Sequence, residues 1–124
     1  MDSERLVADV DELRDYGNDV STESDGVRSY IIVSGFILPD GYEPRATDVM
    51  MMTDYQYPLS AVDMFWTFPH VRCSGGGWPQ NADQFQEFIG KNWQRWSYHY
   101  TWNPAKHNLA SHLEVFHARL ANAA

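Results

Sequence analysis

The chain has 124 residues, of which 44% are hydrophobic and 15% aromatic, and its formal net charge is −8. A chain of this length forms one domain and buries roughly two-thirds of its unfolded surface. No apolar run approaches the ~18 residues of a membrane-spanning helix, the acidic first residues do not resemble a signal peptide, and the lone cysteine excludes an internal disulfide. We therefore expect one domain over residues 1–124, in the cytoplasm and without a membrane partner.

The negative charge is concentrated near the N-terminus. Residues 1–25 hold nine acidic and two basic residues, a net charge of −7, which leaves −1 for the other 99 residues. Nucleic acids bind basic surfaces, so this distribution excludes a nucleic-acid partner. The acidic segment indicates either a docking surface for a basic protein or a solvated helix face.

The first predicted element is an acidic helix over about residues 3–16. Ser3 can cap its start and Gly17 can end it. Its apolar residues recur at helical spacing, at Leu6, Val10 and Leu13. Residues 18–26 are polar and predict a turn-rich loop.

An antiparallel meander is predicted over about residues 27–68. β-Branched and aromatic residues indicate strands at 27–38, 46–53 and 62–68, with turns between them. The three methionines of the second strand are typical of core filler.

The next segment, about residues 69–102, begins with a flexible glycine-rich loop at 73–79. Residues 81–89 predict a short helix, because their apolar residues would share one of its faces. Residues 96–102 alternate strictly between large aromatic residues and small or polar ones, which predicts a strand. One face of that strand would carry Ser97, His99 and Thr101.

The last predicted element is a C-terminal helix over about residues 104–120. Asn103 would cap it and Pro104 would occupy its first position. Its buried stripe would consist of Leu109, Leu113, Phe116 and Leu120. Helices at both ends of a meander predict an α+β protein with helices against an antiparallel sheet.

The order of several of these pieces resembles the ubiquitin-conjugating enzyme family. They are Tyr57-Pro58, the strand at 62–68, and Trp102-Asn103-Pro104 followed by a helix. Three further runs are similar to a divergent prokaryotic branch: Leu38 to Tyr42, Asp63-Met64-Phe65, and Trp93 to His99. The resemblance covers roughly residues 3–120 and implies the ubiquitin-conjugating (UBC-like) fold, a β-meander flanked by an N-terminal and a C-terminal helix.

The resemblance implies a carrier that accepts a ubiquitin-like protein from an activating enzyme as an acyl ester and transfers it to a target. The activating enzyme would dock on the acidic N-terminal helix. A peptidase from the same bacterial operon is a further implied partner. The resemblance also implies antiphage defence as the biological process. No cofactor is implied. The alternative is a catalytically inactive binding module or adaptor for a ubiquitin-like protein.

The nucleophile of this acyl transfer has two candidates, because Cys73 lies 29 residues before Trp102, whereas the family's catalytic cysteine lies a short distance before the Trp-x-Pro motif. Ser97 is closer to the expected place, and His99, two residues on, points to the same side of an extended chain. Histidine can act as a base that activates serine near neutral pH.

Cys73 is the competing nucleophile, because a thiolate is intrinsically stronger and a glycine-rich loop would expose it. His70 and Arg72 would favour its thiolate. Asn103 could donate its amide to an oxyanion, or act only as a helix cap. A metal site is not predicted, because histidines spaced by five on a helix are rotated by about 140° from one another.

Overall fold

The computed structural model describes residues 3–123, so Asp2, counted above in the acidic segment, lies outside it. Its elements are α1 (Glu4–Asp15), β1 (Asp19–Ser24), β2 (Ser29–Ile37), β3 (Tyr42–Glu43), β4 (Ala46–Thr53), β5 (Phe65–Phe68), β6 (Arg72–Cys73), β7 (Gln84–Phe88), β8 (Lys91–Trp96) and α2 (Leu109–Ala123). None of the helices in this range is long and apolar enough to cross a membrane.

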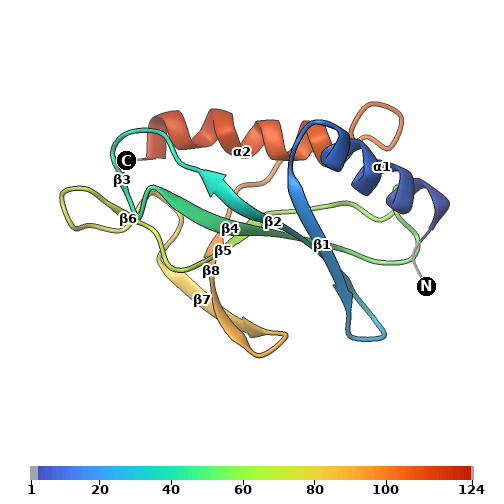
Figure 1. Ribbon diagram of the computed structural model, residues 1–124, viewed down its shortest axis with the longest axis horizontal. Helices are drawn as coiled ribbons and strands as arrows, with labels where there is room; N and C mark the ends of the chain where they lie inside the picture. Colours follow the sequence, from blue (N-terminus) through green and yellow to red (C-terminus); the bar gives the residue numbers. More distant parts are fainter. Residues whose placement is uncertain (1–2, 124) are drawn as a thin grey trace.

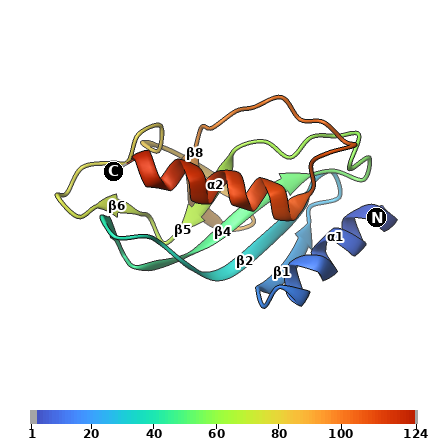
Figure 2. The same ribbon diagram turned by 90° about the horizontal axis from the view of Figure 1, so that it is seen from above.

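The main sheet has six strands in the order β1-β2-β4-β5-β8-β7, and all neighbouring strands are antiparallel. β3 and β6 form a separate two-stranded sheet. α1 and α2 lie on one side of the main sheet (Figure 1), and α2 runs across it with α1 beside the β1 edge (Figure 2). The predicted α+β class, with terminal helices packed on an antiparallel sheet, is confirmed.

The sheet separates two hydrophobic clusters, because side chains alternate between its faces. On the face toward the helices, Ile31 and Met51 pack with Leu13 and Phe116. On the other face, Ile32 belongs to a smaller cluster, which contains Tyr30, Met50, Trp66 and Trp93. The tip of the β7–β8 hairpin supplies Phe88 and Ile89 to this second cluster.

The prediction for α1 is confirmed. Ser3 caps the helix, since its Oγ accepts a hydrogen bond from the backbone N–H of Leu6 at 3.1 Å. The apolar residues at helical spacing are buried. Gly17 follows the helix with a φ of +93°, a conformation that glycine adopts without steric cost.

Two elements were assigned wrongly because their polar or mixed composition hides an edge strand. Residues 18–26, predicted as a loop, contain β1, of which Val20 alone is buried. Residues 81–89, predicted as a helix, contain β7. β7 joins β8 through Ile89 and Gly90, both with positive φ, as a tight hairpin turn requires. Pairing with β8 overrides the local helical pattern.

The predicted strand at 96–102 is also wrong, because the ladder ends at Trp96. Trp96 pairs with Phe65, the first residue of β5, and Met64 before it has a φ of +58°. That conformation leaves β8 without an extended partner beyond Trp96. Burial nevertheless keeps the predicted alternation, with Tyr98 buried and His99 exposed. β5 is accordingly shorter than the predicted strand at 62–68.

The last helix begins later than Asn103-Pro104 predicted. Residues 104–106 form a single turn, and α2 starts at Leu109. Its true cap is Asn108, whose Oδ1 accepts from the backbone N–H of Ser111 at 2.8 Å. The Ser111 Oγ accepts in return from the Asn108 backbone N–H at 2.9 Å. This reciprocal pair satisfies two backbone N–H groups at the start of α2.

Candidate functional site

Ser97 is the first residue after β8 and is half-buried. Its backbone N–H donates to the Asn81 carbonyl at 2.9 Å, which fixes the start of the segment that leaves the sheet. Its Oγ accepts a hydrogen bond from Nε of Arg95 at 3.2 Å. A guanidinium is a permanent cation, so it favours negative charge on an oxygen that it touches.

His99 is exposed and forms a pair with Asp63, from the segment before β5. Its Nδ1 lies 3.0 Å from each carboxylate oxygen of Asp63. An ionised carboxylate can only accept, so Nδ1 carries the proton and Nε2 of the neutral ring is the acceptor. No local pattern in the sequence indicates this pair, because its members are 36 residues apart.

Ser97 is half-buried and His99 is exposed, while Tyr98 between them is buried. Within residues 3–123, no hydrogen bond joins the Ser97 hydroxyl to the His99 ring; the hydroxyl bonds to Arg95 and the ring to Asp63. The two side chains thus have separate partners in the structure.

A buried histidine lies beneath the pair. His112 of α2 has no exposed surface, and its ring stacks on Phe65 with centroids 4.2 Å apart. Its Nδ1 is 2.6 Å from the hydroxyl of Tyr100, and its Nε2 is 3.0 Å from the carbonyl of Met64. Burial lowers the pKa of His112 to about 4, so the ring is neutral at neutral pH.

The tyrosine of this contact is the donor. Burial, and after it the charge of Asp63, raise the pKa of Tyr100 to about 12, so its hydroxyl keeps its proton at neutral pH. The Tyr100 O–H therefore donates to Nδ1 of His112, and Nε2–H of His112 donates to the Met64 carbonyl. Each nitrogen of the buried ring has the one partner that it needs.

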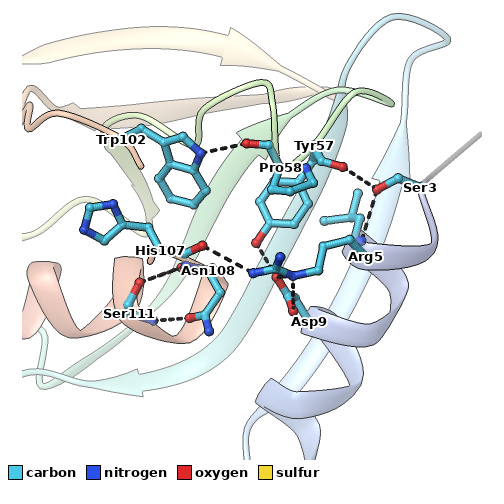
Figure 3. Close-up of polar contacts among 10 residues, drawn as sticks. Ser3, Arg5, Asp9, Tyr57, Pro58, Trp102, His107, Asn108 and Ser111 are labelled. Atoms are coloured by element: carbon cyan, nitrogen blue, oxygen red, sulfur yellow. Dashed lines mark hydrogen bonds and ion pairs between the residues drawn. The ribbon is translucent and has the colours of Figure 1, made fainter. Parts of the chain in front are cut away.

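The Tyr-Pro turn and the tryptophan of the Trp-x-Pro motif lie side by side (Figure 3). The indole Nε1–H of Trp102 donates to the carbonyl of Pro58 at 2.8 Å, and its ring packs on Tyr57. The hydroxyl of Tyr57 donates in turn to Asp9 of α1, which also pairs with Arg5 at 3.0 Å. Burial, followed by the bond to Asp9, raises the pKa of Tyr57.

Asn103 forms a cap, although not of α2. Its Oδ1 accepts from the backbone N–H of Ala105 at 2.9 Å, and its backbone carbonyl accepts from Lys106 and His107. Asn103 therefore holds the single turn that follows Trp102. The side-chain oxygen is engaged, and its role toward an oxyanion stays a prediction.

Cys73 is half-buried at the end of β6, in a closed turn rather than a free loop. Its backbone N–H donates to the Gly77 carbonyl at 2.8 Å, and its own carbonyl accepts from Gly76 at 2.8 Å. Backbone pairing with β3 holds the residue in place.

The two basic residues expected to favour the Cys73 thiolate have other contacts. The guanidinium of Arg72 lies 3.9 Å from the ring centroid of Trp78 and donates to the Gly76 carbonyl. His70 Nε2 is 2.8 Å from the Asn92 carbonyl. The guanidinium of Arg72 therefore contacts its own loop, and the ring of His70 contacts the β7–β8 hairpin.

A shallow groove of about 320 Å³ lies beside the His99 pair. It runs between the β1–β2 turn and the segment before β5, and its lining includes Asp63 together with the apolar residues Val27, Met52, Met64 and Trp66. Among residues 3–123, no three histidine, cysteine or acidic side chains gather as a metal site.

Two helices on one face of an antiparallel sheet, with a Tyr-Pro turn bonded to the tryptophan of a Trp-x-Pro motif, define an α+β protein with a UBC-like fold. The chain belongs to prokaryotic E2 family E, whose family model matches residues 6–123. Neither a curated protein nor a solved structure gives a significant match. Membership of this family indicates a ubiquitin-conjugating-like role, with a ubiquitin-like protein and an activating enzyme as the general classes of partner.

Proposed function

We propose that this protein is a carrier that accepts a ubiquitin-like protein from an activating enzyme as an oxyester on Ser97 and transfers it to a target amine. The observation that supports this most directly is the arrangement of the segment after β8. Arg95, Ser97 and His99 alternate with buried residues, so a cationic donor, a hydroxyl and an imidazole all face outward within five residues. Acyl transfer needs these three kinds of group.

In the first step, Oγ of Ser97 attacks the carbonyl carbon of the activated C-terminal glycine of the ubiquitin-like protein. The Oγ–C bond forms, the bond to the activating enzyme's leaving group breaks, and the hydroxyl proton passes to Nε2 of His99. His99 then gives this proton to the leaving group, so that its ring is neutral again before the second step. Arg95 donates a hydrogen bond to the same Oγ and would favour its loss of the proton, because a cation stabilises negative charge on an oxygen that it touches. A hydrogen bond between the Ser97 hydroxyl and Nε2 of His99 would form only when the acyl donor is bound.

In the second step, an amine of the target attacks the ester carbonyl. The N–C bond forms and the Oγ–C bond breaks. One amine proton is lost to His99, which returns its proton to the departing Ser97 oxygen. The protein is regenerated and the target carries the ubiquitin-like protein through an amide bond.

The test is incubation with the activating enzyme, ATP and the ubiquitin-like protein, followed by a denaturing gel. We expect a covalent band that survives reductant and is cleaved by hydroxylamine, as an oxyester requires. Ser97→Ala should abolish the band, and His99→Ala should slow its formation about 100-fold or more. Cys73→Ala is the matched control and should form the band at the wild-type rate.

The reverse result would assign the role of nucleophile to Cys73 in place of Ser97. A band that is cleaved by reductant, lost in Cys73→Ala and kept in Ser97→Ala would assign a thioester to Cys73. The engagement of Arg72 and His70 elsewhere weighs against that outcome, because a thiolate needs a nearby cation or base.

A second candidate function is that of a binding module, which binds a ubiquitin-like protein without forming a covalent bond to it. The separate partners of the Ser97 hydroxyl and the His99 ring favour it. Absence of any covalent band, together with a complex that survives Ser97→Ala, would establish this function in place of the carrier.

A further inference from the structure

A clamp of side chains joins the two segments that meet at His99. One segment carries Asp63 and Met64, and the other carries His99 and Tyr100. At the surface, Asp63 holds His99 through both carboxylate oxygens at 3.0 Å. In the interior, His112 holds the next residue of each segment, the Met64 carbonyl at 3.0 Å and the Tyr100 hydroxyl at 2.6 Å.

The backbone alone does not hold these two segments together. The last ladder pair between β5 and β8 is Phe65 with Trp96. Met64 then adopts a φ of +58°, which turns the chain away from the sheet. Beyond this point, side chains must fix the distance between Asp63 and His99.

His112 suits this position because of its protonation state. A neutral imidazole has one donor and one acceptor nitrogen, which match the carbonyl of Met64 and the hydroxyl of Tyr100. The low pKa of His112, caused by burial, keeps the ring in this state at neutral pH. Stacking on Phe65 fixes the ring plane.

We propose that Asp63 and His112 are positioning residues for His99: Asp63 fixes the ring tautomer, and His112 fixes the two segments from which Asp63 and His99 project. The inference rests on the proposed function, in which Nε2 of His99 takes the proton of the Ser97 hydroxyl. With Nδ1–H directed at the carboxylate, the lone pair of Nε2 faces the surface where the acyl group would arrive.

The first test is the tautomer of His99, measured by nitrogen NMR of the protein without partners, at a pH where this ring is neutral. We expect the Nδ1–H form in the wild type and a mixture in Asp63→Asn. The matched control is Asp40→Asn, which removes the carboxylate of an exposed ion pair with Arg45. An unchanged tautomer in Asp63→Asn would overturn the role of Asp63.

The second test is the rate of ester formation. Asp63→Asn should lower kcat about 100-fold and leave KM for the loaded activating enzyme within about twofold, because only proton transfer is impaired. A purely structural loss would instead move both constants and the unfolding midpoint. A kcat unchanged from wild type would overturn the role of Asp63 in the reaction.

The buried half of the clamp is tested with Tyr100→Phe, which removes one hydrogen bond and keeps the ring. Its kcat should fall about threefold to tenfold and the Nδ1–H form of His99 should be less populated, since displaced groups lose their alignment. His112→Gln, which keeps a donor and an acceptor, should retain more activity than His112→Leu. If folded Tyr100→Phe kept the wild-type kcat and the wild-type tautomer of His99, the positioning role of His112 would be wrong.

The two kinds of readout separate this inference from the function beneath it. If the wild-type protein forms no covalent band, the carrier function fails, and the NMR experiment still decides whether Asp63 and His112 orient His99. If the band forms and the tautomer does not respond to Asp63→Asn, the carrier function stands and the positioning inference is wrong.

Discussion

Two fully buried polar side chains support the two halves of the candidate site, and they do so differently. Gln94 of β8 lies on the Ser97 side, whereas His112 of α2 lies on the His99 side. Gln94 accepts from Thr67 and from the Val71 backbone N–H, and donates to the carbonyls of Val71 and Ala82. His112 makes two hydrogen bonds, one with a backbone carbonyl and one with a tyrosine.

The difference is one of number and of chemistry. Three of the four hydrogen bonds of this amide tie β8 to the irregular segments at Val71 and Ala82, and the fourth ties it to Thr67 of β5. None of the groups involved titrates near neutral pH. The bond from Tyr100 depends on a neutral ring, because Nδ1 of His112 accepts only in that state, whereas Nε2–H donates to the Met64 carbonyl in either state. We therefore expect the Ser97 side to be held equally at all moderate pH values, and the His99 side to loosen in acid.

The largest effect is expected for Gln94→Leu. The substitution leaves the N–H and carbonyl of Val71 and the carbonyl of Ala82 buried without their partner, which costs about 4 kcal/mol of unfolding free energy. Urea unfolding measures this loss. Gln84→Leu, at an exposed position of β7, is the control and should change stability by less than about 0.5 kcal/mol. Equal losses in both variants would contradict the anchoring role of Gln94.

The next effect is the pH dependence that His112 introduces. The pKa of His112 is about 4 in the folded state against an ordinary value of 6.5, so the unfolded chain binds more protons between these values. Stability is then complete above about pH 6.5 and falls as the pH drops toward 4, by about 3 kcal/mol. Urea unfolding at pH 7 and pH 4 measures the fall.

His112→Gln isolates this contribution, because the carboxylates titrate in the same range in both proteins. The variant should lose about 3 kcal/mol less than the wild type between the two pH values. An identical loss would show that the ring does not stay neutral in the folded state. Gln94→Leu, in contrast, should keep the wild-type dependence on pH.

The smallest effect on stability is expected on the acidic face of α1, outside both regions. Asp9 is buried and bonded to Tyr57, so it belongs to the packing of α1 and not to a docking surface. Asp11 and Asp15 are exposed and Glu12 is half-buried. Converting these three to their amides should change the unfolding free energy by less than about 0.5 kcal/mol.

The same triple variant tests docking of the activating enzyme. If this surface steers the enzyme, ester formation should slow and lose much of its dependence on salt. The control carries the same change of charge elsewhere, at the exposed residues Asp40, Asp83 and Glu87. Unchanged rates and salt dependence in the α1 variant would rule out electrostatic docking there.

Local sequence patterns determined the elements that the rest of the chain packs against. A Ser3 cap and apolar residues at helical spacing were sufficient for α1, because both signals act within a few residues. The β-branched run of β2 and the run of β4 were likewise sufficient, since both strands lie inside the sheet and their side chains are largely buried. The alternating burial of Ser97 to Trp102 was also readable from sequence.

Tertiary structure alone decided where strands pair and which polar groups meet. Residues 84–88 became a strand because β8 offers a partner, and β8 ends at Trp96 because Met64 turns away. The meeting of Asp63 with His99 joins positions 36 residues apart, and no local pattern encodes such a distance. The sequence therefore determined which chemical groups face outward near Ser97, and the packing of distant segments determined the partner of each.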